Sequence, residues 1–200
     1  FDFGLEVGSK PELLIALAHD LSANSTIICN GIKDREFIHL AILSIKIGFK
    51  TILVLESPRE LDLIIEISKE LNVRPLLGIR VKLTNKVSGN WSQSSGDRSA
   101  FGLSVEQVME VINKLKIYDY LDCLILQHSH LGSQIPDIIE IRKATQEACR
   151  FFSEMSKLGA PLTYLDLGGG LGVDYTGEQK SAFNSINYSL DEYCINSRDS

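Results

Sequence analysis

The chain has 200 residues, which is enough for one ordinary domain with a sizeable core. Its apolar fraction of 44% and charged fraction of 23% are typical of soluble globular proteins. With 20 basic against 26 acidic residues and no basic run, the net charge of −6 argues against nucleic acid or an anionic membrane as a partner. No apolar run approaches the length of a membrane span, and the first residues do not form a signal peptide.

The four cysteines are far apart in the sequence and form no CxxC pair: Cys29, Cys123, Cys149 and Cys194. Three of them fall in segments that are expected to be strands or helices. This placement predicts buried free thiols in a reducing compartment, so we expect a cytoplasmic protein. The chain also begins without Met, inside a strand-like segment, which predicts that it is a piece of a longer protein.

Strand-like and helix-like segments alternate along the first 83 residues. Apolar runs predict strands at 1–7, 26–29, 51–55 and 76–83. A helical pattern follows each of the first three strands, and each helix begins at a residue that can cap it: Ser9, Asp34 and Ser57.

The segment 84–100 is rich in Ser, Gly, Asn and Gln, and it is long for a loop in a compact domain, so we expect it to be functional. After it, Ser104 with Gln107 and Asp137 with Glu140 predict two capped helices, the second of which stops at Gly159. Strands are expected at 121–126 and 162–167. The polar sequence beyond residue 175 predicts no element.

The repeated strand–helix order with short connections predicts a parallel sheet with helices packed outside it. About six strands are visible, whereas a closed (β/α) barrel of the TIM type requires eight. In such a barrel the first and last strands would lie before residue 1 and after residue 200. A doubly wound open sheet is the competing architecture, and the strand count leaves both open.

Polar or small residues follow two of the apolar strands directly. Strand 121–126 runs into Gln127, His128, Ser129, His130, Gly132, Ser133 and Gln134, and strand 162–167 runs into Gly168, Gly169 and Gly170. Parallel α/β sheets present their chemistry at the carboxyl ends of the strands. We therefore expect these two strand ends to be neighbours on one ligand-binding rim.

The three glycines from Gly168 to Gly170 are suited to a phosphate cradle, because glycines after a strand let backbone N–H groups approach an anion. They do not form a dinucleotide fingerprint, since Val173 stands where the third glycine belongs. They do not form a P-loop either, since Glu178 follows Gly177 in place of Lys. The alternative is a tight turn that requires positive φ angles.

His128 and His130 alternate and therefore share one face of a strand. A zinc pair is one alternative, although no third ligand appears at a recognisable spacing, and a purely structural role for His128 is another. His130 lies beside Gly132 and Ser133, where its ring could stack on a flat cofactor and the Ser133 hydroxyl could bind a phosphate.

Glu6 and Arg80 both lie at predicted strand ends. If their strands share a sheet, the two side chains could form an ion pair at the rim. The alternative for each is an ordinary surface charge, because neither residue belongs to a motif of its own.

Six segments, in this order, resemble the biosynthetic arginine decarboxylases: GLEVGSKPEL, ICNGIKDREFI, RPLLGIR, SGNWSQSSGDRSAFGLS, HSHLGSQI and DLGGGLGVDYTG. The similarity extends from residue 1 to residue 193. These enzymes use pyridoxal 5′-phosphate and are built on an alanine-racemase-like barrel with a β-rich domain after it. The resemblance implies that residues 1–200 are a partial barrel, with 176–200 unassigned, and that the C-terminal β domain is absent.

The resemblance also assigns roles to seven residues at the cofactor. His130 would stack on the pyridine ring, and Glu6 and Arg80 would pair near the cofactor. Its phosphate would be held by Ser133, Gly168, Gly169 and Gly170. The Schiff-base lysine and the acid that keeps the ring nitrogen protonated would lie outside the chain, since Lys10 and Lys82 do not match the lysine's position. The family further implies a possible use of Mg²⁺.

The function implied by the resemblance is decarboxylation of L-arginine to agmatine and carbon dioxide in polyamine biosynthesis, by a homo-oligomer in the cytoplasm or a plastid. The isolated chain is expected to be inactive, because it lacks the Schiff-base lysine. Within the same class, diaminopimelate or ornithine decarboxylase is the alternative, disfavoured by the loop around Trp91. From another class, the alternative is a non-catalytic fragment that binds the cofactor or a partner.

Overall fold

The computed structural model describes residues 3–22, 24–84, 101–173 and 186–198. Within these residues, six strands form one parallel sheet in chain order. The strands are β1 (Leu5–Val7), β2 (Thr26–Cys29), β3 (Lys50–Leu55), β4 (Leu76–Arg80), β5 (Leu124–Gly132) and β6 (Tyr164–Gly169). This order arises because consecutive parallel strands are joined by short helical crossovers on one side of the sheet.

The helices are α1 (Lys10–Leu17), α2 (Arg35–Lys46), α3 (Pro58–Leu71), α4 (Val105–Tyr118), α5 (Ile138–Lys157) and α6 (Leu190–Arg198). The predicted caps form at the first five. The side chains of Ser9, Asp34, Ser57, Ser104 and Asp137 each accept a hydrogen bond from a backbone N–H of the first turn. At α4 the capping box is complete, because Gln107 Oε1 also accepts from the Ser104 N–H at 3.0 Å.

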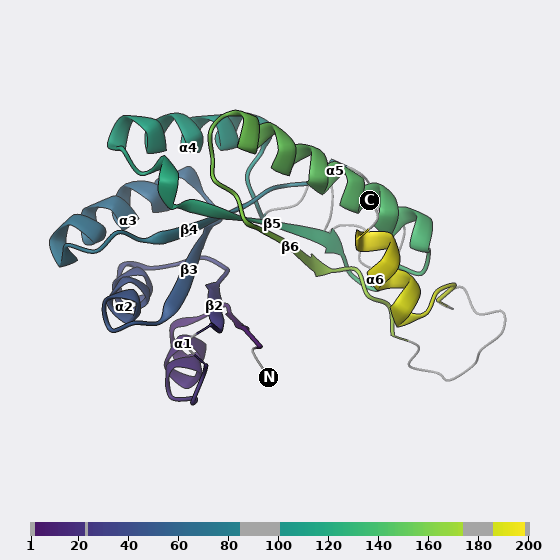
Figure 1. Cartoon of the computed structure of the whole chain (residues 1–200), viewed down its shortest axis with the longest axis horizontal. Coiled ribbons are helices and arrows are strands. Elements are labelled where there is room, and N and C mark those ends of the chain that lie inside the picture. Colours follow the sequence, from purple (N-terminus) through teal and green to yellow (C-terminus); the bar gives the residue numbers. More distant parts are fainter. Residues whose placement is uncertain (1–2, 23, 85–100, 174–185, 199–200) are drawn as a thin grey trace.

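Helices α1 to α5 lie on one face of the sheet and follow its curve, as the arc of ribbons in Figure 1 shows. On this convex face, strand residues such as Ile27 and Leu53 pack with the helices in the main core. Alternate residues of the strands face the concave side, where Ile52, Val54 and Leu126 form a small buried cluster.

The sheet is strongly curled. Lys50 opens β3 and Tyr164 opens β6, with two strands between them. In a flat sheet, a strand spacing of about 4.8 Å would place these two starts about 14 Å apart. The Lys50 ammonium nevertheless lies 5.0 Å from the centroid of the Tyr164 ring. The six strands therefore form a curled half-barrel, which confirms the prediction of an incomplete barrel and shows that the doubly wound alternative is wrong.

The strand predicted at 121–126 differs in its bounds. Leu121–Cys123 forms a 3₁₀ turn, and β5 continues to Gly132 through the polar residues that the sequence places beyond the strand. Gln127 is held there because its Nε2 donates to Ser129 Oγ at 3.0 Å and to the Ala148 carbonyl of α5 at 2.9 Å, although its Oε1 has no hydrogen-bond partner among the described residues. Hydrogen bonding inside the fold thus lets a polar segment occupy a buried strand.

Helix α6 is a second difference, since the sequence predicts no element beyond residue 175.

The prediction of buried free thiols is confirmed for Cys29 and Cys123, whereas Cys194 is exposed. Residues 85–100, including Trp91, lie outside the described residues, so the predicted long loop is not described beyond Thr84. In the described part of the chain, no helix has both the length and the apolarity required to cross a bilayer.

Candidate ligand site at the ends of β5 and β6

The ends of β5 and β6 lie side by side, as the sequence predicts. In the parallel register, His130 is opposite Gly168 and Gly132 is opposite Gly169. Beyond the ladder, the Gly170 N–H donates to the Gly132 carbonyl at 2.8 Å, and the Ile135 N–H donates to the Gly170 carbonyl at 3.1 Å. The backbone itself therefore joins the two strand ends into one structural unit.

Two of the three consecutive glycines adopt a conformation that disfavours other residues. The φ angles are +70° at Gly169 and +82° at Gly170. A Cβ atom on Gly169 would also clash with the Gly132 carbonyl oxygen and would lie 2.5 Å from His130 Cε1. The tight-turn interpretation is therefore correct in its geometry, and the absence of a side chain on Gly169 lets the turn pack directly against the His130 ring.

His128 and His130 both come from β5, but their surroundings differ. His128 is buried, and its Nδ1 lies 2.8 Å from Asp166 Oδ2 on β6. A Cβ atom on Gly168 would lie 2.6 Å from His128 Cε1, so this ring packs directly against the glycine. The structure therefore favours a structural role for His128. No group of three His, Cys, Asp or Glu side chains in the described ranges is arranged to hold a metal ion, so the zinc interpretation gains no support.

His130 is half-buried next to the glycines. Burial lowers the pKa of His130 below its ordinary value, the positive charge of Arg80 and the neighbouring His128 lower it further, and the Glu56 carboxylate opposes the shift in part. The imidazole is therefore kept neutral near physiological pH.

Ser133 follows β5 directly and is half-buried. The next residue, Gln134, has a φ angle of +51° and accepts a hydrogen bond from the Val173 N–H at 2.8 Å. Ser133 therefore lies between two segments that are held to the end of β6. This places the hydroxyl-bearing residue at the same end of the sheet as the glycines.

The predicted ion pair between Glu6 and Arg80 is wrong. Arg80 Nη1 lies 2.7 Å from Glu56 Oε1, and its guanidinium also lies 5.3 Å from the Phe101 ring centroid. Glu6 instead accepts a hydrogen bond from Asn30 Nδ2 at 3.1 Å. The reason is topological: β1 and β4 are separated by two strands, whereas Glu56 follows β3, the immediate neighbour of β4.

Sequence reasoning missed two polar residues at the ends of β2 and β3. Asn30 and Glu56 are largely buried, and Asn30 Oδ1 and Glu56 Oε2 have no hydrogen-bond partner among the described residues. Buried acceptors without a partner are unusual and often mark functional sites. The same signal that singled out His130, a polar residue directly after an apolar strand, could have found both.

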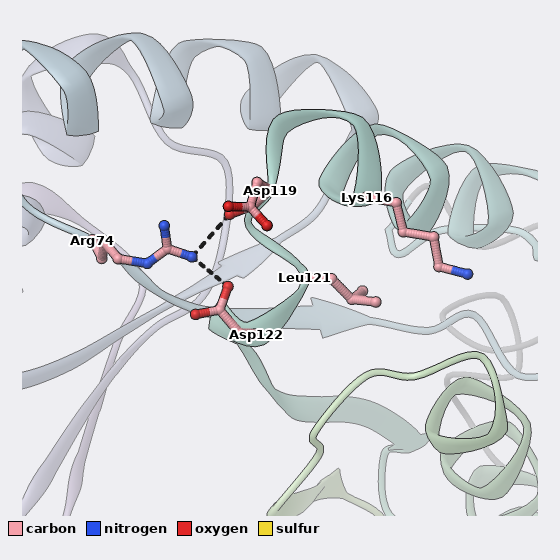
Figure 2. A pocket seen from close by; sticks show the side chains of 5 residues that line it. All are labelled: Arg74, Lys116, Asp119, Leu121 and Asp122. Carbon is pink, nitrogen blue, oxygen red and sulfur yellow. Dashed lines mark hydrogen bonds and ion pairs between the residues drawn. The ribbon is translucent and has the colours of Figure 1, made fainter.

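A hollow at the opposite end of the sheet offers a less suitable site. Its volume is about 520 Å³, and it is lined by Arg74, Lys116, Asp119, Leu121 and Asp122, just before β4 and β5 begin. Figure 2 shows that the Arg74 guanidinium is already engaged, by the Asp119 carbonyl at 2.9 Å and by the Asp122 carboxylate, and that Lys116 points away from it. The Arg74 guanidinium that lines this hollow is therefore already paired with a carboxylate of the same hollow.

The comparison with protein families agrees with the geometry at the strand ends. The family model described as the pyridoxal-dependent decarboxylase, pyridoxal binding domain, matches residues 2–199. The chain belongs to this family. The resemblance to pyridoxal-phosphate-dependent decarboxylases and the half-barrel architecture are thereby both confirmed.

Curated members of the pyridoxal-dependent decarboxylase family are similar along nearly the whole chain. The biosynthetic arginine decarboxylase of Vibrio vulnificus is 50% identical over 193 residues, which cover 96% of this chain and 30% of that protein. The enzyme of the same name from Nostoc sp. is 49% identical over 191 residues, covering 96% of this chain and 28% of that protein. The chain thus spans less than a third of the length of these relatives.

Solved structures show the same fold. The biosynthetic arginine decarboxylase of Campylobacter jejuni superimposes with a TM-score of 0.82 and 37% identity, covering 98% of this chain and 31% of that chain. Diaminopimelate decarboxylase of Helicobacter pylori, complexed with L-lysine, gives a TM-score of 0.80 at 24% identity and covers 98% of this chain and 47% of that chain. The second likeness concerns the fold alone.

Proposed function

We propose that this chain is the cofactor-binding part of an arginine decarboxylase, which converts L-arginine to agmatine and carbon dioxide. The observation that carries the proposal is the meeting of His130 with the glycine turn at the paired ends of β5 and β6. The substrate follows from the similarity to biosynthetic arginine decarboxylases, at 50% identity over 96% of the chain. The solved diaminopimelate decarboxylases are only 24% to 26% identical to this chain, so this alternative is not favoured.

The described residues fit pyridoxal 5′-phosphate. A side chain on Gly169 would clash with the His130 ring, so glycine lets the turn lie directly beside the imidazole that we assign to the cofactor. We assign the pyridine ring to the face of His130, and the phosphate to Ser133, Gly168 and Gly169. Gly170 belongs to the same turn, but its N–H already donates to the Gly132 carbonyl, so its part is to shape the cradle.

Glu6 and Arg80 complete the assignment as residues of the rim, each with its own partner. The guanidinium of Arg80, held by Glu56, supplies positive charge near His130. This charge favours the neutral form of the imidazole, and it also favours an anionic ligand in the same space. Glu6, held by Asn30, brings a carboxylate to the far side of the rim.

When bound, pyridoxal phosphate withdraws electrons from the substrate carbon that loses carbon dioxide. The residues of this chain would hold and orient the cofactor for that chemistry. A neutral His130 packs against the ring without adding a second positive charge, and the glycine turn receives the phosphate without a side chain in the way. The covalent lysine and the acid at the ring nitrogen are assigned to parts of the enzyme outside these 200 residues.

The proposal also includes a homo-oligomeric enzyme in the cytoplasm, as the family resemblance implies. A role for Mg²⁺ would come from the same resemblance. The described residues contain no group of three potential ligands for it.

The experiment uses the full-length protein that carries this chain. Titration with pyridoxal phosphate, followed by absorbance, should show saturable binding, and pyridoxal without its phosphate should bind more weakly. The loaded protein should release carbon dioxide from L-arginine faster than from L-ornithine or meso-diaminopimelate. Binding without any preference for the phosphate would contradict the cradle, and a preference for another amino acid would contradict the assigned substrate.

A further inference from the structure

A buried ion pair lies behind the rim formed by the ends of β2, β3 and β4. The Lys33 side chain is fully buried, the Glu60 side chain is 9% exposed, and Lys33 Nζ lies 3.5 Å from Glu60 Oε2. Burial lowers the pKa of Lys33, and the carboxylates of Glu60 and Glu56 oppose this effect. A buried charge pair is costly to desolvate and is weak evidence for added stability, so its position calls for a different explanation.

The Glu60 carboxylate joins two loops. From the first turn of α3, its Oε1 accepts from the Lys33 N–H at 3.1 Å, in the segment between β2 and α2. Its Oε2 accepts from the Glu56 N–H at 2.8 Å, in the segment between β3 and α3. The Lys33 ammonium also donates to the Gly31 carbonyl. The pair therefore fixes the backbone on both sides of the rim.

The fixed backbone in turn holds the side chain that reaches the site. Glu56 Oε1 accepts from the Gly31 N–H at 3.2 Å and from Arg80 Nη1 at 2.7 Å. Gly31 has a φ angle of +75°, and a Cβ atom there would lie 3.0 Å from the Gly8 carbonyl oxygen. Its peptide is thus held by Lys33 on one side and by Glu56 on the other. The chain of contacts leads from Lys33 and Glu60 through Glu56 to Arg80.

We propose that Lys33 and Glu60 are positioning residues, which hold Glu56 and, through it, the Arg80 guanidinium beside His130. This inference rests on the proposed function, because Arg80 acts there as a residue of the cofactor rim. It also gives Lys33 a role other than covalent attachment of a cofactor: its ammonium is held by Glu60 and by the Gly31 carbonyl.

A merely structural pair would behave differently from a positioning pair. If Lys33 and Glu60 only stabilised the fold, their replacement would weaken cofactor binding to the same extent whether or not Arg80 is present. If they act through Arg80, the loss should disappear once Arg80 is removed. Residues that act through a shared partner show such non-additive effects, whereas independent residues do not.

The test is a double-mutant cycle in the full-length protein, with the dissociation constant of pyridoxal phosphate as the readout. We expect Glu60→Gln to weaken binding about tenfold in the wild-type background and to have no further effect in the Arg80→Met background. Glu56→Gln, which leaves Lys33 and Glu60 unchanged, should give the same pattern, and it replaces Glu60→Gln in the cycle if that variant does not fold.

The matched control is Glu66→Gln, which removes a carboxylate from an exposed pair with Arg35 and should leave binding of pyridoxal phosphate unchanged. Equal losses in both backgrounds would overturn the proposal.

A second readout does not need the cofactor. Because the Glu56 N–H donates to Glu60 and the Gly31 N–H to Glu56, both amides should exchange with solvent faster in Glu60→Gln than in the wild type. If the wild type fails to bind pyridoxal phosphate, the proposed function is wrong, and the exchange rates still test the positioning. Unchanged exchange at both amides would show that Glu60 does not hold this segment.

After the loaded protein is reduced with borohydride, peptide mapping should find the modified lysine at a position other than Lys33. Modification of Lys33 itself would overturn the positioning role.

Discussion

The two sides of the candidate site are held together by different physical means. On one side, the glycine tip (His130, Gly132 and Gly168 to Gly170) is joined through backbone hydrogen bonds and the absence of side chains. On the other side lie the ends of β2, β3 and β4 together with the buried ion pair behind them. This group, which we call the charged rim (Gly31, Lys33, Glu56, Glu60 and Arg80), is joined through carboxylates and cations from three segments. The difference teaches that a closely packed turn can be made by the backbone alone, whereas holding a long guanidinium in place requires a network of charged side chains.

The largest expected effect is on the charged rim. Lys33→Met should leave the Glu60 carboxylate buried without its partner and lower the free energy of unfolding by about 4 kcal/mol. Arg35→Met, which breaks an exposed pair with Glu66 and Glu70, should cost at most about 1 kcal/mol. Urea unfolding of both variants measures the contrast. Similar losses in the two would mean that burial does not distinguish these pairs.

A smaller loss of stability is expected at the glycine tip. Gly169→Ala adds a Cβ in a left-handed conformation and against the Gly132 carbonyl, so it should lower the free energy of unfolding by about 3 kcal/mol and abolish binding of pyridoxal phosphate. Gly48→Ala is the matched control. Gly48 has a φ angle of +104° and no atom within 4 Å of an added Cβ, so only the backbone cost of about 1 kcal/mol remains. Cofactor binding that survives in Gly169→Ala would contradict the cradle.

The contact between His128 of β5 and Asp166 of β6 should contribute less to the free energy of unfolding than the glycine tip does. Asp166→Ala leaves the buried Nδ1 of His128 without its partner, which should cost about 2 kcal/mol and loosen the glycine tip. For comparison, Asp122→Ala removes the partner of a half-exposed Arg74 and should cost less than about 1 kcal/mol. Thermal unfolding of both variants tests this order, and a reversed order would mean that the His128–Asp166 contact is dispensable.

The smallest effect concerns pH. Because burial and Arg80 lower the pKa of His130, the folded state binds fewer protons than the unfolded state below about pH 6.5. Stability should therefore decrease as the pH falls from about 6.5 toward the lowered pKa, and His130→Gln should make this decrease shallower. His19→Gln, at an exposed position, is the control and should follow the wild type. Unfolding curves between about pH 5 and 7 provide the measurement.

The sequence by itself determined the local features of this protein. Caps such as Ser104 with Gln107, the apolar strands and the consecutive glycines can be recognised because each depends on residues close together in the chain. The order of strands and helices then indicated a parallel barrel-like sheet and the pairing of the two polar strand ends. These predictions succeeded because short connections leave consecutive strands few ways to pack.

Only the tertiary structure decided which charges meet. Arg80 pairs with Glu56 rather than Glu6, and Lys33, to which the sequence assigns no role, is buried against Glu60. The polar part of β5 likewise becomes a strand because α5 supplies a partner for Gln127. Such contacts join residues 20 or more positions apart in the chain. They depend on strand order and on the curl of the sheet, which place side chains together in a way that spacing along the sequence does not reveal.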